Sequence, residues 1–232
     1  MTTPRTGTDP WVRLGRITAV TGLSSIVLLF ATIIPLAALG EPAFTASNDE
    51  ARAYLVNVSV GWPQTVIALS SVAAIGILWF VVGLTLVLRR AEGDPPWRST
   101  IALVSGVLLT AYTAMDASLD AAASRGADLD PAVAGYAFAV GSVGFANAWL
   151  ALASFAVCAG WVVVATGIFG RWLGWWAIIS GLGLALSRFF WTSEIWLLPY
   201  GLFWVWMIIV CVRLLRWSPN QVNALPQSAP AA

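Results

Sequence analysis

The sequence contains no lysine and no histidine. Without histidine there is no imidazole base, no histidine-ligated haem and no histidine metal site. Without lysine there is no Schiff base, no catalytic amine and no phosphate-binding loop of the Gly-Lys-Ser/Thr kind. An enzyme would have to use carboxylates, hydroxyls or the two cysteines, and no catalytic arrangement of these groups is recognisable. We therefore expect a non-catalytic protein with no cofactor, no metal and no nucleic-acid partner.

Charge is also scarce. Charged residues make up 10% of the chain and apolar residues 59%, whereas about a quarter of the residues of a soluble domain are charged. A membrane span needs roughly 20 apolar residues in a helix, because the bilayer core offers no water to the backbone. The pattern predicts an all-α, integral membrane bundle of six transmembrane helices. Its spans are expected at about residues 17–39, 64–88, 99–118, 137–166, 173–191 and 195–215.

The fourth apolar stretch, residues 131–170, is too long for one span and contains no polar turn. We interpret it as one helix that begins outside the bilayer at Asp130-Pro131. Aspartate is a preferred N-cap, and proline is favoured at the first helical position. Cys158 and Cys211 fall within spans and are expected to pack as small apolar side chains.

The arginines predict the orientation, because cytoplasmic loops of membrane proteins carry an excess of positive charge. Nine of the twelve arginines flank the spans on one side. They are Arg5, Arg13, Arg16, Arg89, Arg90, Arg98, Arg171, Arg213 and Arg216. The prediction is that both termini are cytoplasmic, with tails at 1–16 and 217–232 around a transmembrane domain at 17–216. The remaining arginines, Arg52, Arg125 and Arg188, fall on the outer side, the first two in solvated loops.

The first span has an alternative interpretation. Its basic start, apolar core and Ala38-Leu39-Gly40 also fit a signal peptide with a cleavage site. The apolar run is much longer than the usual 7–15 residues, so we favour an uncleaved span. Cleavage would leave five spans and would not invert the others.

A surface helix is expected on the outer side at about residues 48–59. Ser47 and Glu50 have the spacing of a capping box. Ala51, Tyr54 and Leu55 then begin one apolar stripe. The helix could lie on the outer leaflet as an amphipathic lid, or pack as a connector to the second span.

A short internal repeat links two spans. Residues 97–106 and 172–181 both begin with Trp, have Ala five positions later, and end in Ser-Gly. The repeat suggests that spans two and three are related to spans four and five as parallel hairpins. In the second copy, Ala177, Gly181 and Ala185 recur every four residues, a spacing that permits close helix packing.

One group of polar residues near the outer end forms the candidate site. Tyr112, Asp116 and Asp120 follow each other every four residues, so they should share one helix face. Arg188 interrupts an apolar run, and an ionisable residue at membrane depth is expected to have a partner. Asp116 is its first expected partner and Glu194 its second. Asn147, within the fourth span, completes the group. A structural ion pair, a ligand or ion site, and catalysis all remain open.

Three short segments resemble a broad group of uncharacterised bacterial multi-pass membrane proteins. They are Gly170-Arg171-Trp172-Leu173-Gly174-Trp175, residues 16–23, and the outer loop starting Gly40-Glu41-Pro42. The resemblance implies a membrane domain of unknown function in the bacterial inner membrane and assigns no functional residues. The abundant alanine and absent lysine also suggest a bacterium with a GC-rich genome.

These observations lead to two hypotheses of function. The first is a non-catalytic accessory component whose partners are the lipid bilayer and another membrane protein or a second copy of itself. The alternative is a small transporter, or a membrane protein that binds lipids or small molecules, with its polar site near the outer leaflet.

Overall fold

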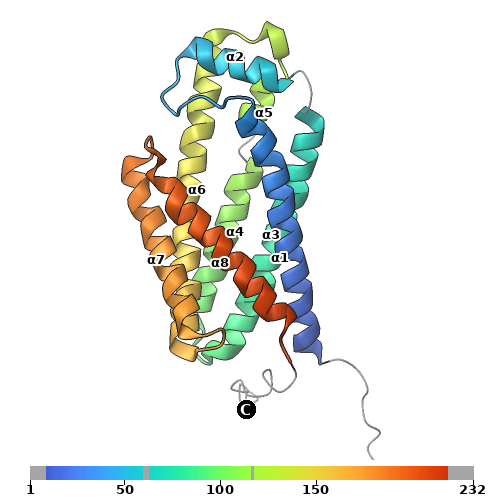
Figure 1. The fold of residues 1–232 in the computed structure, drawn as a ribbon, viewed down its shortest axis with the longest axis vertical. Helices are drawn as coiled ribbons and strands as arrows, with labels where there is room; N and C mark the ends of the chain where they lie inside the picture. Colours follow the sequence, from blue (N-terminus) through green and yellow to red (C-terminus); the bar gives the residue numbers. More distant parts are fainter. Residues whose placement is uncertain (1–8, 60–62, 116–117, 219–232) are drawn as a thin grey trace, which may run out of the picture.

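The computed structural model describes residues 9–59, 63–115 and 118–218 (Figure 1). In these ranges the regular structure is entirely helical, which confirms the all-α prediction. The eight α-helices are α1 (Pro10–Ala38), α2 (Asn48–Ser59), α3 (Pro63–Glu92), α4 (Trp97–Met115), α5 (Ser118–Ala123), α6 (Pro131–Thr166), α7 (Arg171–Ser187) and α8 (Leu197–Leu215). Three short 3₁₀ helices are η1 (Gly126–Asp128), η2 (Arg188–Phe190) and η3 (Glu194–Trp196).

The bundle is formed by the long helices α1, α3, α4, α6, α7 and α8 (Figure 1). Along the chain, α1 packs on α3, α3 on α4, α4 on α6, α6 on α7 and α7 on α8. Helix α8 crosses the bundle diagonally and returns to α1, so the first and last helices are neighbours. The start of α1 and the end of α8 lie at one end of the molecule, whereas α2 and α5 lie at the other.

Five stretches of the described chain are long and apolar enough to cross a membrane. They are Pro10–Ala38, Ala68–Glu92, Pro131–Thr166, Arg171–Phe190 and Glu194–Leu215. By helix length and composition, the chain is a multi-pass membrane protein. The remaining predicted span, at about residues 99–118, coincides largely with α4, a 19-residue helix that packs on α3 and α6 but is not one of the five. The count of six spans therefore stays a prediction.

Helix α6 begins where the Asp-Pro pair predicts. The Asp130 carboxylate accepts hydrogen bonds from the backbone N–H groups of Ala132 (2.8 Å) and Val133 (3.4 Å), and Pro131 is the first helical residue. Its 36 residues make the helix about 54 Å long at 1.5 Å per residue, well beyond a hydrocarbon core of about 30 Å. Helix α6 is therefore longer than one crossing needs, and it provides the surface on which α2 packs.

Helix α2 packs against protein rather than presenting its apolar stripe to the surroundings. The side chains of Ala51, Tyr54 and Leu55 are buried in a separate small core. The α5, α6 and connecting residues of that core are Ala122, Ala123, Leu129, Ala134, Ala137 and Phe138. Burial raises the pKa of the Tyr54 hydroxyl above its usual range, with a further contribution from Glu41. The structure therefore favours the packed connector over the amphipathic lid.

The predicted capping box starts α2. The Glu50 carboxylate accepts hydrogen bonds from the backbone N–H and the hydroxyl of Ser47, both at 2.8 Å. The Ser47 hydroxyl in turn accepts one from the Glu50 N–H at 3.4 Å. These hydrogen bonds lower the pKa of the Glu50 carboxyl. The reciprocal pair satisfies two N–H groups that the helix itself leaves without acceptors.

Arg52 does more than solvate a loop, which corrects the role expected for it. Its Nε donates to the carbonyl of Leu129 at 2.6 Å, and its Nη2 donates to the carbonyl of Ala127 at 2.9 Å. Both acceptors lie between α5 and α6, more than 70 residues away in the sequence. The side chain therefore ties α2 to the segment that leads into α6.

We expect Arg52→Ala to loosen α2 without unfolding the bundle, because the two carbonyls lose charge-assisted hydrogen bonds of about 1.5–3 kcal/mol each. Hydrogen exchange of the α2 backbone amides in the detergent-solubilised chain should become faster. Exchange in the part of α6 that follows Phe138 in the sequence should not change. Arg125→Ala is the matched control, because Arg125 is an exposed arginine of the same end. Equal effects of the two substitutions would contradict the role of Arg52.

The two copies of the internal repeat occupy equivalent places in the bundle. Trp97 and Trp172 are about half exposed, whereas Ala102 and Ala177 are fully buried. A Cβ on Gly106 of α4 would meet Val81 of α3. A Cβ on Gly181 of α7 would likewise meet Ala153 of α6. Each repeat glycine therefore faces the preceding helix of its own hairpin, as two related hairpins would require.

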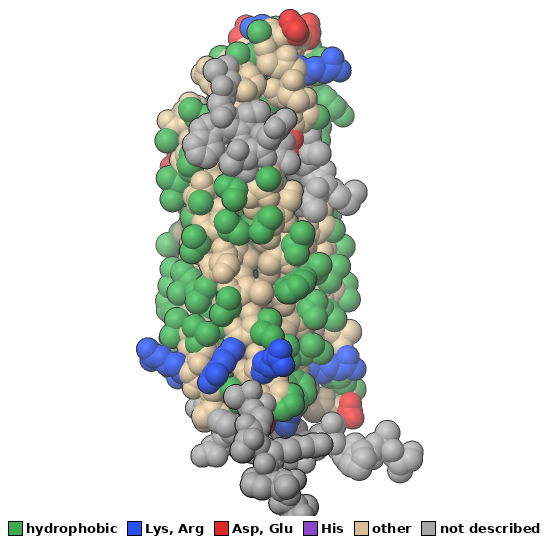
Figure 2. Space-filling view, turned by 90° about the vertical axis from the view of Figure 1, so that its right-hand side faces the viewer, with side chains coloured by type: hydrophobic (Ala, Val, Ile, Leu, Met, Phe, Trp, Pro, Cys, Tyr) green, Lys and Arg blue, Asp and Glu red, His purple; other side chains and the backbone are tan. Residues whose placement is uncertain are grey.

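The surface of the bundle divides into zones along its long axis (Figure 2). Hydrophobic side chains cover the middle of the face in view. Basic side chains gather at the end where the termini lie, and acidic and basic side chains together occupy the opposite end. This zoning is the one a bilayer imposes, with charge at both water interfaces and apolar side chains between them.

Candidate polar site at the outer end of the bundle

The expected polar group is only partly assembled in the described structure. Asp116 lies outside the described residues, so its pairing is not addressed. Tyr112 is exposed on α4 (Trp97–Met115), and Asp120 belongs to α5 (Ser118–Ala123), with the two residues between these ranges not described. The single helix face expected for the three residues is therefore not shown.

Arg188 and Asn147 form the polar contact of this site. Arg188 directly follows the last residue of α7, and Asn147 lies on α6, the helix against which α7 packs. The Arg188 Nε and Nη2 atoms donate to the Asn147 Oδ1 at 3.2 and 3.0 Å. The guanidinium carbon also lies 6.0 Å from the centre of the Trp191 ring, within the range of a cation–π contact. The charge is therefore held by a neutral amide and an aromatic ring.

Glu194, the second expected partner of Arg188, is not paired with it. Glu194 is exposed at the start of η3, and the described residues show no ion pair between the two side chains. The short turn between α7 and α8 separates the carboxylate from the guanidinium, although the two lie only six residues apart. The sequence places Asn147 in the same group but does not indicate that its amide oxygen accepts the hydrogen bonds of Arg188.

An aromatic cluster surrounds this contact, and the sequence did not predict it. Trp149 and Trp196 are stacked with centroids 5.2 Å apart, and Phe145 meets the Trp196 ring edge-on at 5.3 Å. Phe44, from the loop after α1, stacks on Trp191 at 5.7 Å. The only sequence signal for it is the high density of aromatic residues after Arg188. The cluster is joined to the polar contact through Trp191, which lies beside the Arg188 guanidinium.

The chemistry open to this arrangement is limited. An arginine does not lose its proton in proteins, so Arg188 can attract an anion or fix a structure but cannot act as a base. Within the described ranges, no three cysteine, aspartate or glutamate side chains lie close enough together to hold a metal ion. The contact is suited to holding η2 against α6, or to attracting an anion near the membrane surface.

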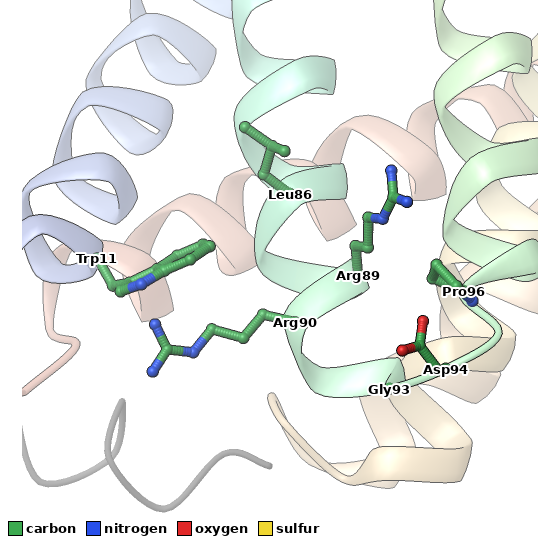
Figure 3. Close-up of a pocket in the computed structure, with 7 residues that line it drawn as sticks. All are labelled: Trp11, Leu86, Arg89, Arg90, Gly93, Asp94 and Pro96. Carbon is green, nitrogen blue, oxygen red and sulfur yellow. The ribbon is translucent and has the colours of Figure 1, made fainter. Parts of the chain in front are cut away.

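A basic pocket lies at the opposite end of the molecule. Its volume is about 550 Å³, and it is lined by Trp11, Leu86, Arg89, Arg90, Gly93, Asp94 and Pro96 (Figure 3). The Arg90 guanidinium lies over the Trp11 ring, with its carbon 4.4 Å from the ring centre. The sequence had assigned the two arginines to orientation alone, because nothing in it indicates that α1 and α3 enclose a cavity.

No protein-family model matches the chain, and neither characterised proteins nor solved structures show significant similarity to it. The resemblance to uncharacterised bacterial membrane proteins therefore stays an expectation from short motifs.

Proposed function

We propose that the chain is a non-catalytic protein of the bacterial inner membrane that crosses it six times and binds another membrane protein through α7. In this proposal both termini are cytoplasmic and α2 and α5 lie outside. The positive-inside rule supports the orientation, because the described arginines at the end that holds the termini outnumber those at the other end.

The observation that carries the partner-binding role is the outward face of α7 and the turn after it. Its large apolar side chains alternate at spacings of three and four residues, and all are half exposed or more. They are Trp172, Trp175, Ile179, Leu182, Leu186 and Phe189. This is the seven-residue pattern with which one helix packs along another. Its two tryptophans and one phenylalanine are of the types enriched at protein interfaces. The opposite face of α7 is already occupied by α6.

Photo-crosslinking in the native membrane tests this role. A photoreactive phenylalanine analogue at Ile179 or Leu182 is expected to form a discrete protein adduct, identifiable by mass spectrometry. The control position is Val27, which is equally apolar and exposed but lies on α1. An adduct at the α7 positions alone supports the proposal, and its mass distinguishes a second copy from a different protein. Lipid adducts alone at all three positions would exclude a partner on α7.

The alternative, a small transporter or ligand-binding protein, is favoured by one observation. Arg188 keeps a permanent charge at the end of α7, and among the described residues its hydrogen-bond acceptor is the Asn147 amide oxygen alone. A transport path requires that this contact be reached by water. We expect Asn147→Cys to stay unlabelled by a membrane-impermeant thiol reagent in intact cells, beyond the background of the parent chain, because the Arg188 guanidinium lies directly on the side chain at position 147. Rapid labelling would favour the transporter over the accessory role.

A further inference from the structure

The basic pocket is formed by three segments that meet at the end of the bundle where the termini lie (Figure 3). Trp11 belongs to the first turn of α1. Leu86, Arg89 and Arg90 belong to the last turns of α3. Asp94 belongs to the turn that leads to α4. Figure 3 shows Leu86 toward the middle of the bundle, Arg90 reaching toward Trp11, Arg89 pointing away from Arg90 on the other side of the helix, and Asp94 in the turn.

The two arginines of the pocket differ in their contacts from Arg98, another arginine at this end of the bundle. Arg98 is paired with Glu92 at 2.8 Å, in the same α3–α4 turn. The Glu92 carboxylate is also occupied by the backbone N–H groups of Arg98 and Ser99. In the described part of the chain, neither guanidinium of Arg89 or Arg90 makes a hydrogen bond or an ion pair. Their donors are therefore available to a ligand.

The aromatic contact orders one of these cations in advance. With its carbon 4.4 Å from the Trp11 ring centre, Arg90 is held on the α1 side of the pocket. Arg89 is exposed and leaves α3 in a different direction. A guanidinium is the side chain best suited to bind a phosphate, because its N–H groups match two phosphate oxygens at once.

The order of the lining residues along α3 matches the order of groups in a phospholipid. Leu86 and Arg90 lie four residues apart on α3, or about 6 Å along the helix, and Asp94 follows in the turn beyond its end. From the bilayer centre outward, a lipid presents an acyl chain, a phosphate and a headgroup in the same sequence. Two arginines and one aspartate give the lining a formal charge of +1, which balances one phosphodiester.

We propose that this pocket binds the phosphate of an anionic glycerophospholipid. Arg90 donates to the phosphate oxygens beside Trp11, and Arg89 adds a second positive charge at the same end of α3. Leu86 and Trp11 contact the glycerol and the start of the acyl chains. The Asp94 carboxylate accepts a hydrogen bond from a headgroup hydroxyl. The inference rests on this end of the bundle lying at a membrane surface and is independent of partner binding by α7.

The test measures lipid binding to the purified full-length chain in detergent by native mass spectrometry. The probes are dioleoyl phosphatidylglycerol, dioleoyl phosphatidylcholine and water-soluble glycerol phosphate. For R89Q/R90Q we expect the affinity for phosphatidylglycerol to fall by about tenfold or more, because charged hydrogen bonds of this kind are lost. The control R171Q/R213Q removes two exposed arginines that flank spans on the same side but do not line the pocket. It should lower the affinity by less than about twofold.

A further double variant, R89K/R90K, keeps the test decisive if the charge removal disturbs insertion. R89K/R90K retains both charges but loses the paired geometry of the guanidinium, so binding should weaken severalfold while the elution profile stays that of the folded chain. Three results would overturn the proposal. They are equal losses in both glutamine pairs, equal binding of the two lipids, and competition by glycerol phosphate at the concentrations at which the lipid binds. The last would assign the pocket to free phosphate esters.

Discussion

Replacing Gly174 by leucine is expected to abolish the packing of α6 against α7 and with it most of the folded protein. A Cβ on Gly174 would lie 2.6 Å from the carbonyl oxygen of Gly160 and 2.7 Å from the backbone nitrogen of Val164. A Cβ on Gly160 would meet the Gly174 carbonyl oxygen at the same distance. These contacts are with backbone, so only separation of the two helices relieves them. Adding carbon atoms to a well-packed core typically costs about 1–3 kcal/mol of folding free energy. The leucine side chain is larger than the single methyl group of alanine, so its cost should be greater.

The measurement is the midpoint of thermal unfolding in detergent, together with the fraction of the chain that elutes as a single species. Gly174→Ala should already lower the midpoint clearly, and Gly174→Leu should leave little folded chain. Gly201→Ala is the matched control, because Gly201 also lies within a long helix but a Cβ there meets nothing within 4 Å. It should be neutral or stabilise by up to about 1 kcal/mol. A similar loss in G174A and G201A would refute the close-packing argument.

The second large effect is expected at two buried tryptophans, Trp149 of α6 and Trp206 of α8. Both are 1% exposed, and replacement of either by alanine should cost about 3–5 kcal/mol. Replacement by phenylalanine separates them. The Trp206 Nε1 donates to the carbonyl of Leu173 at 3.0 Å, whereas the Trp149 Nε1 has no partner in the described structure. W206F therefore loses a buried hydrogen bond that W149F does not.

We expect W206F to be less stable than W149F by about 1 kcal/mol, the net contribution of one such bond. Reversible unfolding in mixed detergent micelles can resolve this difference, and both variants remove the same atoms. Equal stability of W149F and W206F would mean that the Leu173 contact contributes nothing. A less stable W149F would show that its indole nitrogen does have a partner.

The features that the sequence predicts well are encoded within a few neighbouring residues. The start of α6 follows from Asp130-Pro131, and the start of α2 follows from Ser47 and Glu50. In both places the polar group and the backbone N–H that it satisfies lie within three residues of each other. Long apolar stretches likewise predict α1, α3, α6, α7 and α8 as membrane-crossing helices.

The contacts of the candidate site could not be predicted in this way, because they depend on how the helices are rotated against each other. Asn147 faces Arg188 because α6 and α7 are fixed in register by the close approach of Gly160 and Gly174, more than a dozen residues from the site. The acceptors of Arg52 are backbone carbonyls, which every residue has, so no residue type in the sequence marks them. Phe44 joins the aromatic cluster from a loop that shows no pattern.

The diagonal course of α8 sets the order in which the bundle can be completed. Gly15 of α1 lies against Leu214 and Trp217, and Gly22 lies against Cys211. When α1 leaves the ribosome, these partners have not yet been synthesised, so lipid must cover its α8-facing side throughout translation. Closure of the bundle is therefore a late event in biogenesis, and a nascent chain that stops before α8 presents an unfinished helix face to the quality-control proteases of the membrane.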